Sequence, residues 1–133
     1  MEISLATAFV TVSDPDESIA FYRDALGLEV RNDVGKGSMR WVTMVSPTQP
    51  EVAIVLNPTH GGREADGDTI AALLAKGSLN GLIFRTPDVD ETFEKVRATG
   101  AEVLQEPMDM FYGVRDCAFR DPSGNLVRIQ QAK

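Results

Sequence analysis

Two stretches of the chain, "SDPDESIAFYRDALGLEV" at residues 13–30 and "TPDVDETFEKVRATGAEV" at residues 86–103, follow one pattern. Each begins with an aspartate, Asp14 or Asp88, that has a glutamate three residues later, which is the spacing of a helix capping box. Apolar residues then recur at helical spacing, and a glycine ends the pattern before a Glu-Val pair resumes as a strand. The repeat predicts two equivalent helices, each followed by strands.

Strand-like segments surround each predicted helix in the same order, one before it and three after it. In the first half they are residues 6–12, 28–32, 39–46 and 52–57, and in the second half 81–86, 102–105, 114–119 and 125–130. This order predicts one α+β domain of two βαβββ modules, whose curved mixed sheets surround a concave cavity. We place module 1 at about 3–57, a linker with a short helix at 58–79, and module 2 at about 80–131.

The last predicted strand carries a charge among apolar residues. In "DPSGNLVRIQQ", residues 121–131, the first four residues are typical of a type I turn. Side chains alternate along a strand, so Arg128 shares a face with Leu126 and Gln130, opposite Val127 and Ile129. If each helix covers one face of its sheet, Arg128 points into the cavity on the other face.

The repeat also indicates which other residues face the cavity. Thr7 and Gly81 occupy matching positions on the first strands, and Val55 matches Arg128 on the last strands. Trp41 lies where alternation is poor, so either face is open to it, and Tyr112 stands beside a glycine where we expect the cavity mouth. The candidate ligand-binding residues are Thr7, Phe9, Trp41, Val55, Gly81, Tyr112 and Arg128.

Composition excludes several classes of protein. The 133 residues are 43% hydrophobic and carry a formal net charge of -7, which argues against nucleic acid or an anionic membrane as a partner. No apolar run approaches the roughly 18 residues of a membrane-spanning helix. Cys117 is the single cysteine, so no disulfide can form within the chain, and we expect a cytoplasmic protein with an inert thiol at this position.

The motifs "SIAFYRDALGLEV" at 18–30 and "YGVRDCAFRDPSGNLVRIQQ" at 112–131, set in a doubled βαβββ frame, resemble the vicinal oxygen chelate superfamily. This superfamily includes glyoxalase I, extradiol dioxygenases and bleomycin-resistance proteins. The resemblance implies a glyoxalase-like fold and a homodimer, but no single reaction, because one fold supports many functions.

The same resemblance places the metal ligands of catalytic members at the cavity-facing positions, which here hold Thr7, Val55, Gly81 and Arg128. Valine and glycine side chains offer no donor atom, and arginine is a permanent cation that repels a divalent ion. The only histidine, His60, lies in a loop. We therefore expect no metal and no other cofactor.

Two roles for Arg128 remain open from the sequence. Its guanidinium could anchor a carboxylate or phosphate of a ligand, since its planar fork matches those groups. Alternatively it pairs with a carboxylate of the chain such as Glu2 or Glu51, because an unpaired buried charge is costly.

The favoured function is binding of a small organic molecule in a metal-free cavity, as in bleomycin-resistance proteins. The net negative charge favours a cationic or amphipathic guest, whereas Arg128 favours a carboxylate on it. The alternative is a glyoxalase-type lyase, isomerase or dioxygenase with unusual or absent metal ligands, for which Glu51, Asp109 and Asp116 are the carboxylates to examine. A third hypothesis is an interaction module without a ligand.

Overall fold

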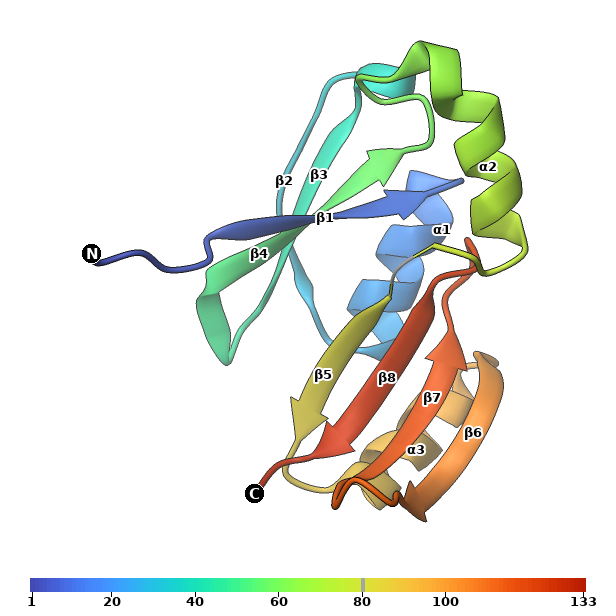
Figure 1. Cartoon of the computed structure of the whole chain (residues 1–133). Coiled ribbons are helices and arrows are strands. Elements are labelled where there is room, and N and C mark those ends of the chain that lie inside the picture. Colours follow the sequence, from blue (N-terminus) through green and yellow to red (C-terminus); the bar gives the residue numbers. More distant parts are fainter. Residues whose placement is uncertain (80) are drawn as a thin grey trace.

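A computed structural model describes residues 1–79 and 81–133, and its chain folds as two βαβββ modules (Figure 1). The elements of module 1 are β1 (Thr7–Val12), α1 (Pro15–Ala20, continued by a π-helical turn at Phe21–Ala25), β2 (Glu29–Val34), β3 (Trp41–Ser46) and β4 (Gln49–Pro58). The connection holds a 3-10 turn (Glu64–Asp66) and α2 (Gly67–Ala75). Module 2 consists of β5 (Leu82–Thr86), α3 (Val89–Ala98), β6 (Glu102–Asp109), β7 (Arg115–Arg120) and β8 (Leu126–Gln131).

Each module forms its own four-stranded mixed sheet. The strand orders are β1-β4-β3-β2 and β5-β8-β7-β6, and in each sheet the first pair is parallel while the others are antiparallel. The repeat is visible in the register, because Phe9 lies beside Val55 in one sheet as Ile83 lies beside Arg128 in the other. The predicted α+β class with two modules is therefore confirmed.

Asp14 and Asp88 cap the N-termini of their helices, as the sequence predicts. The carboxylate of Asp14 accepts hydrogen bonds from the backbone N–H groups of Asp16 and Glu17, and Asp88 accepts one from Glu91. Past each helix the chain turns through a glycine with positive φ in the equivalent place. These caps fix where α1 and α3 begin and how the chain leaves them.

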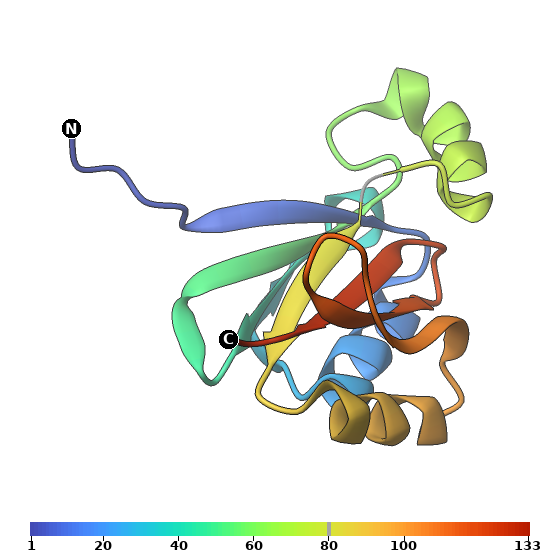
Figure 2. The ribbon, with the colours of Figure 1, turned by 60° about the horizontal axis from the view of Figure 1, so that its bottom comes forward.

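The two helices cover the inner faces of the sheets and join the modules in one hydrophobic core (Figures 1 and 2). Tyr22 and Leu56 from module 1 belong to the same buried cluster as Phe93 and Phe119 from module 2, whose rings stack with centroids 5.4 Å apart. The opposite face of each sheet is left without a helix.

The turn before β8 connects the modules through buried hydrogen bonds. The Asp121 carboxylate accepts from three backbone N–H groups of its own turn and, at 2.7 Å, from the hydroxyl of Tyr22 on the helical segment of module 1. Asn125 donates from its side-chain amide to the carbonyl of Thr11, and the backbone N–H of Ser13 donates to the Ser123 hydroxyl. The turn predicted from sequence thus also holds the two modules together.

Element ends differ modestly from the predictions. β6 runs on to Asp109, so Met108 belongs to a strand rather than to a loop, and Met39 lies in a 3-10 turn before β3. α2, at Gly67–Ala75, lies within the predicted linker of residues 58–79. In the part of the chain that the structure describes, no helix has the length and apolar character needed to cross a membrane.

Gly124 is the glycine on which the inter-module turn depends. Its φ is 117°, and a Cβ there would collide with the backbone carbonyl of Leu74 in α2, whereas a Cβ at Gly100 (φ 91°) meets nothing within 4 Å. We expect Gly124→Ala to cost about 3 kcal/mol or more of unfolding free energy, and Gly100→Ala about 1 kcal/mol.

Urea unfolding of the two variants measures this difference directly. Equal losses of stability at the two positions would contradict the close approach of α2 to the turn.

Candidate functional site

The open face of the first sheet carries an exposed aromatic pair. Phe9 and Trp41 are 58% and 44% exposed, and their rings meet edge to face with centroids 5.4 Å apart. The indole N–H of Trp41 donates to the Thr43 hydroxyl at 3.1 Å, which sets the ring over this face. Val55 lies laterally between Phe9 and Thr43 and is buried beneath them. We call Thr7, Phe9, Trp41, Thr43 and Val55 face 1.

The open face of the second sheet is polar at its centre. Arg128 on β8 lies between Ile83 on β5 and Ala118 on β7, and the next row along the strands holds Asp116. The Arg128 Nη1 donates to the Oε1 of Gln105 at 3.1 Å and pairs with Asp116 Oδ1 at 3.2 Å. We call Ile83, Gln105, Tyr112, Asp116 and Arg128 face 2.

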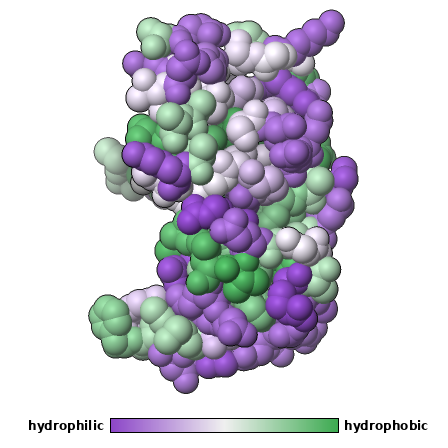
Figure 3. Space-filling model, turned by 90° about the vertical axis from the view of Figure 1, so that its right-hand side faces the viewer, coloured by the Kyte–Doolittle hydropathy of each residue, from purple (hydrophilic) through white to green (hydrophobic). Residues whose placement is uncertain are grey.

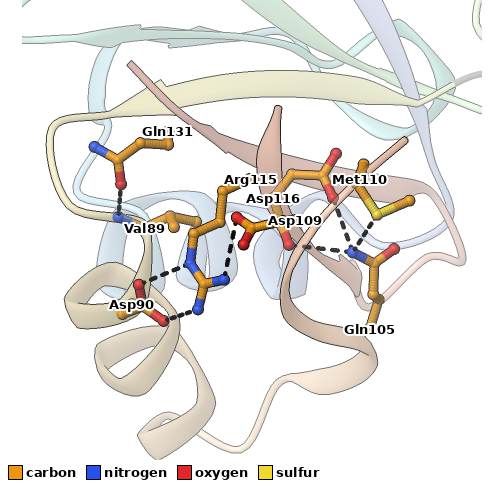
Figure 4. Close-up of polar contacts among 8 residues, drawn as sticks. All are labelled: Val89, Asp90, Gln105, Asp109, Met110, Arg115, Asp116 and Gln131. Carbon is orange, nitrogen blue, oxygen red and sulfur yellow. Dashed lines mark hydrogen bonds and ion pairs between the residues drawn. The ribbon is translucent and has the colours of Figure 1, made fainter. Parts of the chain in front are cut away.

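Three side chains hold the carboxylate of Asp116, which is almost fully buried. Besides Arg128, the side-chain amide of Gln105 donates to Oδ1 at 2.8 Å, and the Tyr112 hydroxyl donates to Oδ2 at 2.7 Å. Figure 4 shows the Gln105 amide pointing at Asp116, with the sulfur of Met110 on its other side. The same amide also donates to the backbone carbonyl of Asp116.

These contacts oppose the effect of burial on the ionisation of Asp116. Burial acts to raise the pKa of this carboxyl, but the hydrogen bonds from Tyr112 and Gln105, together with Arg128, outweigh it and lower the pKa below its usual range. The hydrogen bond to Asp116 in turn raises the pKa of Tyr112, and burial adds to this. Face 2 therefore holds an ionised aspartate beside an arginine and a neutral tyrosine.

The predicted site residues fall on two separate sheets. Thr7, Phe9, Trp41 and Val55 lie on face 1, which resolves the orientation of Trp41, while Tyr112 and Arg128 lie on face 2. Gly81 precedes β5, and a Cβ there would collide with the backbone carbonyl of Leu126 on β8. Convergence of all seven on one ligand cavity stays a prediction.

Three cavities bear on the predicted ligand site. One of about 550 Å³ opens between β4 and β5, another of about 550 Å³ lies between α2 and the turn at Asp121, and a third of about 180 Å³ is lined in part by Phe9 and Gly81. Among the described residues, the lining of these three includes none of Thr7, Trp41, Val55, Tyr112 and Arg128. Ile83 of face 2 lines the first cavity and Phe9 of face 1 lines the third, so each face borders one cavity.

The built-in partner of Arg128 differs from the residues suggested by sequence. Neither Glu2 nor Glu51 pairs with Arg128. Its partner is Asp116 on the neighbouring strand β7, two residues before Ala118, which lies directly beside Arg128. Gln105, the other partner of Arg128, is not among the predicted site residues. It reaches the site because a bulge in β6 aligns it with Ala118. The alternation of side chains along one strand does not predict the register between two strands, so this contact could not be predicted.

The family model of the glyoxalase/bleomycin resistance protein/dioxygenase superfamily matches residues 4–129. The chain belongs to this superfamily. YurT of Bacillus subtilis (strain 168), an uncharacterized protein, is 30% identical, and the match covers 98% of this chain and 99% of YurT.

Solved structures of this superfamily share the whole fold. UcmS2 is 34% identical with a TM-score of 0.86, and the match covers 99% of this chain and 100% of UcmS2. TnmS3, described as an antibiotic binding protein from Streptomyces sp. CB03234, is 26% identical with a TM-score of 0.75, and the match covers 100% and 99% of the two chains.

The positions at which the superfamily resemblance implies metal ligands do not fit a metal here. Val55 and Gly81 offer no donor atom, and Arg128 brings a cation that is already paired with Asp116. Throughout residues 1–79 and 81–133, no three His, Cys, Asp or Glu side chains are grouped so as to hold a metal ion. The metal-free state of the protein stays a prediction.

Cys117, which the sequence analysis expects to be inert, belongs to the core. It is fully buried on β7, and burial raises the pKa of its thiol to about 11. The thiolate needed for nucleophilic attack is therefore scarce at neutral pH.

The paired state of Asp116 makes stability depend on acid pH. Because its pKa is lower in the folded chain, ionised Asp116 stabilises the fold above the unfolded pKa of about 3.9, and this contribution is lost as pH falls through the lower folded value. We expect the free energy of unfolding of the parent chain to fall more between pH 5 and pH 2 than that of Asp116→Asn, as measured by urea unfolding at each pH.

Glu106→Gln removes an equal charge from an exposed position on β6 and serves as the control. If the free energies of unfolding of the parent and of Asp116→Asn fall in parallel with pH, ionised Asp116 does not stabilise the fold through its contacts.

Proposed function

We propose that this protein binds a small organic molecule on its open sheet faces, without a resident metal, and that it acts by sequestering that molecule. The observation that carries the proposal is the exposed pair Phe9 and Trp41 on face 1, since exposed aromatic rings supported by a sheet are costly unless they meet a partner. The antibiotic-binding description of TnmS3 supports the same reading.

A homodimer forms part of this proposal. Phe111 beside face 2 is 97% exposed, and β1 and β5 are edge strands whose backbone groups on one side are unpaired. A second copy of the chain would cover Phe111 and these edges while leaving Phe9 and Ile83 to the ligand. We place this protein in the cytoplasm, in keeping with its lone buried cysteine.

The chemistry of face 2 favours binding over catalysis. A general base works best with a pKa near the working pH, whereas the pKa of Asp116 is lowered and its oxygens already accept two side-chain hydrogen bonds and form an ion pair with Arg128. The raised pKa of Tyr112 makes it a weak acid at neutral pH. Turnover by a lyase, isomerase or dioxygenase is the competing outcome of the test.

Titration of the single tryptophan tests the proposal. Bleomycin and doxorubicin, added to protein purified without chelator, are expected to change Trp41 fluorescence at a ligand-specific midpoint, and Phe9→Ala is expected to weaken binding about tenfold, or about 1.4 kcal/mol. Leu104→Ala, which removes an exposed apolar side chain on β6, is the matched control.

Metal analysis of the same preparation completes the test. The proposal expects well under one divalent ion per chain and unchanged ligand after incubation. A stoichiometric ion, or conversion of either ligand, would contradict it in favour of an enzyme.

A further inference from the structure

Arg128 has unused donors on an accessible surface. A guanidinium has five N–H bonds, and the contacts of Arg128 in the described residues, with Gln105 and Asp116, both involve Nη1. The Nε and Nη2 groups donate no hydrogen bond to the described residues, and the side chain is 24% exposed. These groups can donate to a molecule that lies on face 2.

The charge of Arg128 is largely compensated at the same place. Asp116 is ionised and within 3.2 Å, so a second carboxylate approaching Arg128 would meet attraction and repulsion of similar size. It would also have to shed its water, which carries a large cost for an ion and a small one for a carbonyl. Arg85 at the edge of the same face is an exposed cation, separated from Asp116 by Gln130 across the sheet.

Apolar side chains adjoin the unused donors. Ile83 is the lateral neighbour of Arg128 on β5 and is 67% exposed, while Met108 lies beside Asp116 and is 48% exposed. Tyr112, also 48% exposed, has its hydroxyl fixed on Asp116, which leaves its ring as an apolar surface. Figure 3, which shows the molecule from the right of Figure 1, has apolar patches in several places on a largely polar surface.

We propose that face 2 is a subsite for a neutral aromatic carbonyl compound, whose oxygen accepts hydrogen bonds from Arg128 and whose ring lies on Ile83, Met108 and Tyr112. This inference rests on the proposed function and adds the ligand chemistry. It replaces the anionic anchor, one of the two roles that the sequence leaves open for Arg128, because Asp116 removes the net positive charge that an anion would need.

Three naphthalene probes separate the contributions of the carbonyl, the negative charge and the ring to binding on face 2. 2-Acetylnaphthalene offers a neutral carbonyl, 2-naphthoate a carboxylate, and 2-ethylnaphthalene the ring alone. In NMR titrations we expect the ketone to bind about fivefold more tightly than the hydrocarbon, and the carboxylate no more tightly than the ketone. The Nε–H signal of Arg128 should shift with the ketone and stay in place with the hydrocarbon, which needs no variant protein.

Removing the compensating charge should reverse the preference. Asp116→Asn keeps a side chain of the same shape but leaves Arg128 as a net cation, so 2-naphthoate is expected to gain at least tenfold in affinity while the ketone changes by less than threefold. Arg85→Gln is the control for the second cation on this face, and it should leave the ketone's advantage over the hydrocarbon unchanged.

The outcomes distinguish this inference from the proposed function. Equal binding of ketone and hydrocarbon, or tighter binding of 2-naphthoate to the parent chain, overturns the inference while ligand binding stands. A shift of the Arg128 signal with the carboxylate alone does the same. Binding of none of the three probes, while bleomycin or doxorubicin still binds, overturns the inference alone, and binding of none of the five compounds overturns both.

Discussion

A buried carboxylate holds this protein together. Asp121 accepts three backbone hydrogen bonds within its turn, and its other oxygen accepts from the Asn125 amide and from the hydroxyl of Tyr22. Burial, followed by the nearby Asp121, raises the pKa of Tyr22, which keeps the phenol protonated as the donor. Because the turn belongs to module 2 and Tyr22 to module 1, one carboxylate fixes the approach of the two helix-covered faces.

The outward faces of the sheets follow from that arrangement. Because α1 and α3 each cover one face of their own sheet, the opposite faces are available to a ligand: face 1, with its aromatic pair, and face 2, with its compensated arginine. The usual metal positions carry Val55 and Arg128, so the chemistry available is apolar contact and hydrogen-bond donation. Superfamily membership determines the fold, while these residues determine which ligands the fold can bind.

The doubled frame, both helix caps and the turn at Asp121 could be predicted because each depends on neighbours in sequence. Alternation along β8 likewise placed Arg128 on the open face. The partner of Arg128 could not be predicted, since it depends on the register between β7 and β8 and on a bulge in β6 that brings in Gln105. Trp41 was ambiguous for the same reason, because its orientation is set by contact with Phe9 on a strand that is distant in the sequence.

The dependence of both modules on Asp121 can be measured by native-state hydrogen exchange of the Asp121→Asn variant. The backbone amides of Leu56 in β4 and Phe119 in β7 lie in the fully buried centres of the two sheets. If Asp121 joins the modules into one cooperative unit, both amides lose the same free energy of protection. Loss of protection at Phe119 with unchanged protection at Leu56 would show that the modules unfold independently, and would contradict this account.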